Sequence, residues 1–425
     1  MSQLQKKAGL LTKAVAGVAL GLSALTTAQA EDPIRIAYIE PLSGPFANVG
    51  EMGLFHFRYT ADRINEEHGG IMGRPIEIVP MDNRQSPSES AQLVQRAIDQ
   101  GIQFVSQGNG SNVAGAIVET VDRHNRRNPD RRALYLNYAA IDPALTNDRC
   151  SFWHFRFDAE SRIKMAALSD FMMGEEDVRK VYLLNQDYSH GHVVAAEAKR
   201  MLAEKRPDVE IVGEVLHPIG QVRDFSPYIS RIRQSGADSV ITGNWGNDLT
   251  LLIREANSAG LDVNFYTYYG GGLGVPAAVG DRGIGTLFQI TEWHSNLPVE
   301  QGWADNEEWL VGYKERHPET DWYYQRVYNM FMMLKAAIEA DQSTDPLDVA
   351  MNLRGMEWES PTGTVYIRED DHQVHQDMYI SVMAEQDGDQ VKHDTENSGV
   401  GFRTVAKVDW QDTVLPTSCN MRMPR

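Results

Sequence analysis

The sequence predicts an α/β protein with two parallel β-sheets, each covered by helices on both faces. A length of 425 residues corresponds to two or three domains of ordinary size. Short apolar segments alternate along the chain with segments of helical period, which is the pattern of strands that pair in parallel through helical connections. The alternation is interrupted at residues 150–161 and then resumes, so we expect one sheet before the interruption and a second sheet after it.

The first half contains four expected strands joined by three helices. The first helix has an apolar face over residues 54–64 and ends at Gly69-Gly70. The second begins at the sequence SPSE (86–89), a capping box with Pro at the first helical position. The third begins near Ser111. The four strands are expected at 34–39, 75–83, 102–108 and 133–140.

The second half repeats this pattern and then changes. Helices are expected at 193–204, 226–234 and 248–258, between strands at 181–186, 209–215, 238–244 and 264–270. Two further helices follow, one over 325–340 and one capped by Asp345-Pro346. The last apolar segments, 362–369 and 377–385, are expected to be strands that join either sheet.

The composition excludes several functional classes. The chain is 42% hydrophobic and 23% charged, which is ordinary for a globular protein. Its net charge is −19, so it lacks the basic surface of a nucleic-acid-binding protein, and an anionic membrane surface would repel it.

The first thirty residues have the pattern of a secretory signal peptide. Lys6, Lys7 and Lys13 precede the apolar run 14–25, which is too short to span a bilayer, and a small-residue site ends at Ala30. We expect cleavage after Ala30 and a soluble periplasmic product. Cleavage would remove three of the 40 Lys and Arg residues and none of the 59 Asp and Glu residues, which changes the net charge from −19 to −22.

The exported chain has two cysteines, Cys150 and Cys419. In an oxidising compartment an even pair favours a disulfide, here one that would attach the C-terminus to the first third of the chain. The alternative is a pair of buried thiols.

No recognisable catalytic or metal-binding constellation emerges. The spacing Gly272-x-Gly274-x-x-Ala277 partly matches a dinucleotide fingerprint but occurs late in the chain, without its usual context. His190 and His192 could form a metal pair, yet no other ligand cluster supports them. We therefore expect no enzyme activity, no cofactor and no metal.

The features that favour ligand binding are stronger. Gly108-Asn109-Gly110-Ser111 joins a strand to a helix start, where backbone N–H groups and the Ser111 hydroxyl can bind a carboxylate. An ordinary N-cap serine is the alternative. Trp245 and Tyr269 lie where strands meet polar or Gly-rich loops, which is where open α/β sheets bind ligands.

Several segments together carry a family resemblance. The sequence resembles the type I periplasmic solute-binding proteins of ABC importers, specifically the branched-chain amino acid group. The resemblance implies two Rossmann-like lobes joined by three crossovers, an interlobe ligand cleft, and delivery to permease subunits by a monomeric protein. The matching segments are 34–53, 63–98, 136–146, 181–191, 223–238 and 253–261.

By this resemblance, lobe 1 comprises 31–157 and 291–358, and lobe 2 comprises 158–290 and 359–405. The tail 406–425 returns to lobe 1. A secreted α/β enzyme and a receptor-like sensor are the alternatives from other functional classes.

The resemblance also implies a set of ligand-binding residues. Ser111 would take the carboxylate, the first-lobe aromatic position aligns with Val49 beside Asn48, and either Tyr323 or Tyr324 fills a crossover position. The expected ligand-binding residues are Ser111, Ala139, Ala140, Ile141, Tyr188, His190, Trp245, Tyr269, Gly270 and Tyr324.

One departure from the family pattern bears on the ligand. Members that bind α-amino acids usually have an acidic residue for the ammonium group where this chain has Tyr269. A buried ammonium without an acidic partner is unfavourable, so we expect an acid without an α-amino group, aromatic or 2-oxo. Asp248 could instead pair with an amine, which leaves branched-chain amino acids or amides as the alternative.

Overall fold

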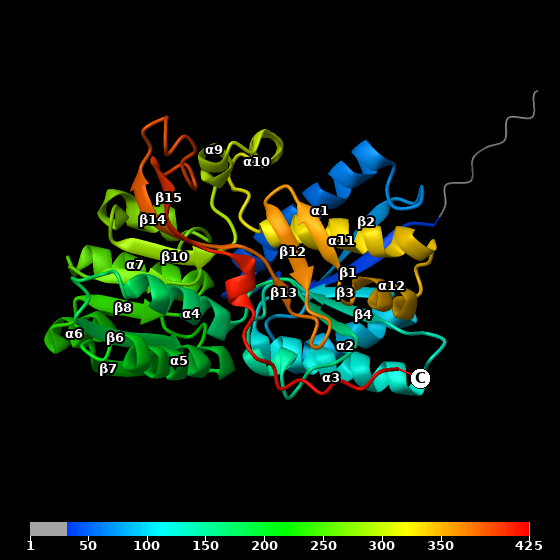
Figure 1. Ribbon diagram of the computed structural model, residues 1–425, viewed down its shortest axis with the longest axis horizontal. Coiled ribbons are helices and arrows are strands. Elements are labelled where there is room, and N and C mark those ends of the chain that lie inside the picture. Colours follow the sequence, from blue (N-terminus) through cyan, green and yellow to red (C-terminus); the bar gives the residue numbers. More distant parts are fainter. Residues whose placement is uncertain (1–31, 425) are drawn as a thin grey trace, which may run out of the picture. The chain divides into compact units, whose positions relative to one another are not determined.

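The computed structural model describes residues 32–424, in which two large sheets each carry helices (Figure 1). The predicted α/β class is confirmed. The expected signal peptide at 1–30 lies outside the described residues. We call the five-stranded sheet with its helices the first lobe and the seven-stranded sheet with its helices the second lobe.

The first lobe contains a fully parallel sheet. Its strand order changes direction at β1, which lies between β2 and β3, so the loops after β1 and β3 diverge and leave a crevice. In sheet order the strands are β2 (Ile76–Asp82), β1 (Ile34–Glu40), β3 (Phe104–Gln107), β4 (Leu134–Asn137) and β5 (His154–Arg156).

The second lobe repeats this order, because β6 lies between β7 and β8 as β1 lies between β2 and β3. Strands β6, β7, β8, β9 and β10 are parallel to one another, and β14 and β15 extend the sheet in antiparallel pairing. In sheet order the strands are β15 (Val400–Val408), β14 (Met378–Glu385), β10 (Leu287–Thr291), β9 (Asn264–Thr267), β8 (Ser239–Thr242), β6 (Lys180–Gln186) and β7 (Glu210–His217).

The helices begin and end largely for local reasons. Of the predicted capping box at α2, the N-cap bond is present, with the Ser86 hydroxyl accepting from the Glu89 N–H at 3.3 Å, whereas the Ser86 N–H donates to the Asn83 carbonyl. Helix α1 ends at Gly69 with φ of 68°. The α-helices of the first lobe and the connecting region are α1 (Ala47–His68), α2 (Pro87–Asp99), α3 (Ser111–Arg127), α9 (Leu297–Gln301), α10 (Ala304–Arg316), α11 (Gln325–Asp341) and α12 (Pro346–Leu353). Those of the second lobe are α4 (Ser161–Met172), α5 (Ser189–Lys205), α6 (Ser226–Ser235), α7 (Gly246–Ser258) and α8 (Val275–Val279).

The segment 362–369 joins neither large sheet. Its strand β12 (Gly363–Ile367) pairs with β11 (Glu357–Ser360) and β13 (Val374–His375) in a separate three-stranded sheet. This small sheet is attached to the first lobe, because Gln373 forms a parallel bridge with Arg156 of β5. The expected change of lobe at residue 359 stays a prediction.

The chain passes between the lobes three times before β15 and once more after it. The first passage follows β5, the second follows β10, and the third joins β13 to β14. After β15 the tail returns through a 3₁₀ turn (Trp410–Thr413) beside β13, where His375 Nδ1 and the Thr413 hydroxyl lie 3.0 Å apart.

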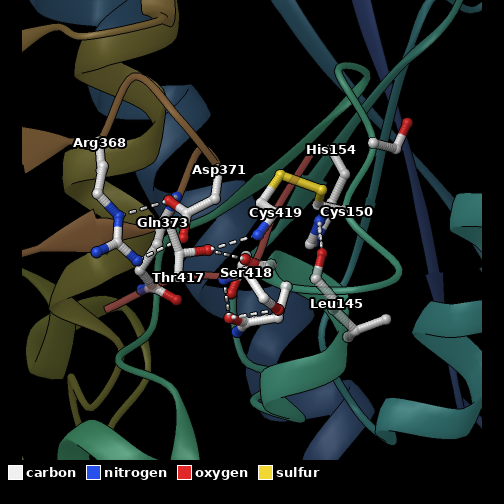
Figure 2. The surroundings of a disulfide bond; sticks show 12 residues. Leu145, Cys150, His154, Arg368, Asp371, Gln373, Thr417, Ser418 and Cys419 are labelled. Atoms are coloured by element: carbon white, nitrogen blue, oxygen red, sulfur yellow. Dashed lines mark hydrogen bonds and ion pairs between the residues drawn. A yellow bond between two sulfur atoms is a disulfide. The ribbon is translucent and has the colours of Figure 1, made fainter. Parts of the chain in front are cut away.

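The predicted disulfide between Cys150 and Cys419 is confirmed. Figure 2 shows the tail beside it, where Ser418 N donates to Asn147 and Thr417 donates to the carbonyl of Thr146. Arg368 of the small sheet donates to the carbonyl of Leu415. The tail is therefore attached to the first lobe both covalently and by hydrogen bonds.

Replacing both cysteines with serine should lower the free energy of unfolding by about 2–4 kcal/mol, because the disulfide closes a loop of 269 residues in the unfolded chain. Denaturant titration of the oxidised protein and of the C150S/C419S variant measures the change. Reductant should lower the midpoint of the wild type and leave that of the variant unchanged. Equal midpoints for wild type and variant would contradict the prediction.

Candidate ligand-binding site

The carboxyl ends of strands from both sheets meet around one cavity. Loops after β1, β3 and β4 supply the first-lobe wall, and loops after β6, β8 and β9 supply the second-lobe wall. Because both sheets have their change of strand order here, the topology itself creates the space. The lining residues are Val49, Gly108, Asn109, Gly110, Ser111, Ala139, Ala140, Ile141, Tyr188, His190, Trp245, Tyr269, Leu273, Tyr324 and Arg326.

The structure brings together every expected site residue except Gly270. Gly270 instead donates its N–H to the Thr267 hydroxyl at 2.9 Å and supports the loop behind the wall. Of the two crossover tyrosines, Tyr324 lines the cavity and Tyr323 does not. Val49 lines the cavity, whereas its neighbour Asn48 does not.

The start of α3 forms the donor-rich end of the cavity. Gly110 precedes the helix with φ of 91°, a conformation that favours glycine, and Ser111 is its first residue. Within residues 32–424, no hydrogen bond occupies the backbone N–H of Ser111 or Asn112. The Ser111 hydroxyl accepts from Asp142 N at 3.2 Å, which leaves its own proton free to donate.

The backbone N–H groups of Ala139 and Ala140 are already occupied. Both donate to the Asn137 side-chain oxygen, at 3.2 and 2.8 Å. These two residues therefore shape the wall, while the available backbone donors belong to α3.

Glu40 positions the loop before α3 from behind. Its buried carboxylate accepts from Gly108 N at 2.6 Å and Asn109 N at 3.2 Å. Burial raises the pKa of Glu40 to about 7, against the opposing effect of these hydrogen bonds. Glu40 therefore occupies the backbone N–H groups of Gly108 and Asn109, although it does not itself line the cavity.

His190 contributes a neutral ring. Nε2 lies 3.0 Å from the carbonyl of Gly243, so it carries the proton, and Nδ1 lies 2.9 Å from the Ser161 hydroxyl. Burial lowers the pKa of His190 to about 4. Because both nitrogens have protein partners, His190 presents ring carbon atoms rather than a free nitrogen.

His190 and His192 do not point to a shared metal position, because His190 is buried whereas His192 is exposed and its ring contacts Asp187 at 2.7 Å. No group of three or more potential ligand side chains is arranged around a metal position in residues 32–424.

Aromatic rings close the cavity between the lobes. Trp245 donates from Nε1 to the Tyr188 hydroxyl at 2.7 Å, which fixes the indole. Phe46, from the loop before α1, stacks on Trp245 with ring centroids 4.4 Å apart. Since Phe46 belongs to the first lobe and Trp245 to the second, this stack is a direct contact between the lobes.

The remaining wall carries a cation. Arg326, at the start of α11, lines the cavity with its guanidinium over the Tyr324 ring, 4.8 Å from its centroid. Burial opposes its charge, but Asp158 and Glu292 outweigh burial and raise the pKa of Arg326. Tyr269 reaches Asp158 behind the wall at 3.3 Å.

Asp248 is not part of this wall. Its carboxylate accepts from Gln186 and from Gly220 N, both at 2.8 Å, and it does not line the cavity. Among the described residues, the lining therefore contains one cationic side chain and no carboxylate.

Residues 33–389 match the sequence profile of the family described as "Periplasmic binding protein". This chain belongs to the periplasmic binding proteins. The resemblance to the branched-chain amino acid group is confirmed by curated relatives. "Leu/Ile/Val-binding protein homolog 4" from Brucella melitensis is 32% identical, over 97% of this chain and 98% of the relative. The "Leucine-, isoleucine-, valine-, threonine-, and alanine-binding protein" of Pseudomonas aeruginosa is 24% identical, over 79% and 86%.

Solved structures agree on the fold of this periplasmic binding protein. A leucine-, isoleucine-, valine-, threonine-, and alanine-binding protein from Brucella ovis, in a closed conformation, has a TM-score of 0.79 at 29% identity, covering 92% of this chain and all of that one. A solute-binding protein from Rhodopseudomonas palustris in complex with 3,4-dihydroxybenzoic acid has a TM-score of 0.75 at 20% identity, covering 89% and 98%, which shows the fold alone.

No helix among residues 32–424 of this periplasmic binding protein is both long and apolar enough to cross a bilayer. Sequence reasoning missed Leu273 and Arg326 of the lining, and it missed Phe46 and Glu40, which support the wall from outside the lining. Glu40 ends an apolar strand and Phe46 follows the Gly44-Pro45 turn, so both had a local signal. Arg326 had none, since an arginine in the first turn of an amphipathic helix is ordinarily exposed.

We expect this protein to lose stability as the pH falls from about 6.5 towards 4. Burial lowers the pKa of His190 to about 4 and that of four other histidines to about 3, His56, His294, His372 and His375. In the unfolded chain these rings take up protons near pH 6.5, so below that pH the unfolded state binds more protons and becomes more favourable. Burial raises the pKa of Glu40 to about 7 and also raises that of Glu160, Glu175 and Glu396, and these acids have the opposite effect. Burial likewise lowers the pKa of His154, His217 and His317, so the histidines outnumber the acids.

Thermal unfolding at a series of pH values from 7.5 to 5 measures this dependence. The midpoint temperature should fall by several degrees, since each buried histidine contributes about 1.4 kcal/mol per pH unit once its unfolded form is protonated. His192→Gln, at an exposed ring, is the matched control and should leave the profile unchanged. A midpoint that is constant or rises on acidification would show that the buried rings are not held neutral.

Proposed function

We propose that this chain is the substrate-binding component of an ABC importer that captures a small carboxylate without an α-ammonium group, an aromatic or 2-oxo acid. The observation that carries the proposal is the charge of the cavity wall, where Arg326 is the charged side chain and Tyr269 stands in place of an acidic residue. An ammonium group enclosed here would face a guanidinium while no carboxylate lines the cavity, which is unfavourable at low dielectric constant.

In this proposal binding proceeds in two steps. The carboxylate first docks on the first lobe, at the free donors of Ser111 and the α3 N-terminus. Closure then places Trp245, Tyr269 and His190 over the ligand, and the Phe46–Trp245 stack forms between the lobes. The closed form is presented to the permease, and no covalent chemistry takes place. The ligand sets the size of the population shift through its preference for the closed form.

The wider context of the proposal follows the family. We propose export through the cleaved signal peptide at 1–30, a monomeric protein in the periplasm, and a ligand cleft between the two lobes. The R. palustris protein in complex with 3,4-dihydroxybenzoic acid supports only the point that this fold can enclose an aromatic acid.

Branched-chain amino acids are the second candidate. The names of the relatives favour them, because Leu/Ile/Val-binding homologues align with nearly the whole chain. In that case an acidic group would have to reach the ammonium, and either Asp158 or Asp248 would have to change partners.

Two measurements decide between the candidates. Mass spectrometry of small molecules released on denaturing the native protein identifies the natural ligand. Titration calorimetry of the ligand-free protein compares benzoate, phenylpyruvate and 4-methyl-2-oxopentanoate with leucine and valine. We expect at least one acid to bind at least tenfold more tightly than either amino acid. Tight binding of leucine or valine with none for the acids would establish the second candidate.

Ser111→Ala should weaken binding of the preferred acid about 10- to 100-fold, because a hydrogen bond to a charged group is worth about 1.5–3 kcal/mol. Ser230→Ala, whose hydroxyl bonds to its own exposed helix, is the matched control and should not change the affinity. An unchanged affinity in Ser111→Ala would place the carboxylate elsewhere in the cavity.

A further inference from the structure

Arg326 is held beside the segment that lines the anion end of the cavity. Its Nε donates to the carbonyl of Tyr138 at 2.6 Å, and Tyr138 directly precedes Ala139 and Ala140 of the wall. The guanidinium is therefore fixed next to the position proposed for the ligand carboxylate. Since Ser111 and Arg326 line the same cavity, a substituent on the carbon adjacent to a carboxylate bound at Ser111 can face Arg326.

The guanidinium also retains donor capacity. Nη1 donates to Glu292 at 2.6 Å, whereas Nη2 makes no hydrogen bond within residues 32–424 and only an ion pair with Asp158 at 3.4 Å. Asp158 is shared, because Lys164 lies 2.9 Å from its other oxygen and the Tyr269 hydroxyl also reaches it. Arg326 is 1% exposed, so water cannot freely supply the missing acceptor.

The buried charges around Arg326 already balance, so the acceptor that Nη2 lacks can be an uncharged group. Two buried acids, Asp158 and Glu292, already match two buried bases, Lys164 and Arg326. What Nη2 lacks is therefore a hydrogen-bond acceptor rather than a full negative charge. A guanidinium has donors and no acceptor, so a carbonyl or hydroxyl oxygen satisfies it and an ammonium group cannot.

We propose that Arg326 is the specificity-determining residue of this site and that it donates from Nη2 to an oxygen on the carbon next to the ligand carboxylate. The protein is then a receptor for 2-oxo or 2-hydroxy acids and discriminates against both 2-amino acids and acids without a substituent at that carbon. This inference rests on the proposed capture of a carboxylate and adds the chemical group that accompanies it.

The experiment uses pairs of acids that differ only in the oxygen at the second carbon. Phenylpyruvate is compared with 3-phenylpropanoate, and 4-methyl-2-oxopentanoate with 4-methylpentanoate, by titration calorimetry on the ligand-free full-length mature protein. In the wild type at least one oxo acid should bind at least tenfold more tightly than its partner. In Arg326→Gln this ratio should fall to within about threefold, because the remaining difference no longer includes the guanidinium.

The variants must separate recognition from structural support. Arg326→Gln alone leaves Glu292 buried without its cation, which can destabilise the fold. The double variant E292Q/R326Q removes both charges and is used if the single variant does not fold. Glu292→Gln alone keeps Arg326 and is the matched control, in which the ratio between the paired acids should stay above tenfold. A merely structural arginine would change the affinity of both members of a pair equally and leave their ratio intact.

The results distinguish failure of the proposed role of Arg326 from failure of the proposed function. A wild-type ratio near one for both pairs, or a high ratio that survives in Arg326→Gln or E292Q/R326Q, overturns the role of Arg326 and leaves carboxylate capture standing. If none of the four acids binds while leucine or valine does, the proposed function itself fails. A high ratio in the wild type that collapses with Arg326 and persists in Glu292→Gln supports the inference.

Discussion

The rest of the structure depends on a cluster of four buried charges beneath the ligand cavity. Asp158, Lys164, Glu292 and Arg326 are each 3% exposed or less, and each is stable in that setting only because it faces an opposite charge. Asp158 lies in the first passage between the lobes, Glu292 opens the second, and Lys164 belongs to α4 of the second lobe. Arg326 reaches both passages from the first lobe. The same ion pairs therefore hold the lobes at their junction and set the polarity of the cavity floor.

The proposed function requires an acidic protein to bind an acid, and the donors around the cavity explain how it could do so. With a net charge of −19, the long-range field repels an anion, so attraction must come from donors within contact distance. The start of α3 supplies such donors, and Glu40 holds the loop before it without lining the cavity. Enclosure strengthens these local interactions, since closing the aromatic wall over the ligand lowers the dielectric constant around it.

Residue patterns predicted the elements and the outline of the site, and they failed where the determining contact is long-range. The N-cap at Ser86 and the helix start at Ser111 are local signals, and each appears where expected. The disulfide joins residues 269 apart, but it could be predicted because the sequence has two cysteines and therefore one possible pairing. The segment 362–369 reads equally well as a strand of any sheet, because periodicity does not specify a pairing partner. Arg326 is buried only because Tyr138 and Glu292, 188 and 34 residues away in sequence, provide acceptors in the folded chain.

The C-terminal tail shows how a covalent clasp can coexist with movement of the lobes. Asp377, in the third passage, accepts from Trp410 N at 2.9 Å and pairs with Lys407 at 2.8 Å, so the third and fourth passages run side by side. After these passages, the disulfide and the hydrogen bonds that hold the tail come from the first lobe or from the small sheet attached to it, including Cys150 and Arg368. The disulfide therefore fixes the tail to one lobe rather than one lobe to the other. In the proposed mechanism, rotation of the second lobe about the paired passages would leave the disulfide unchanged while the contact of Phe46 on Trp245 opens and closes.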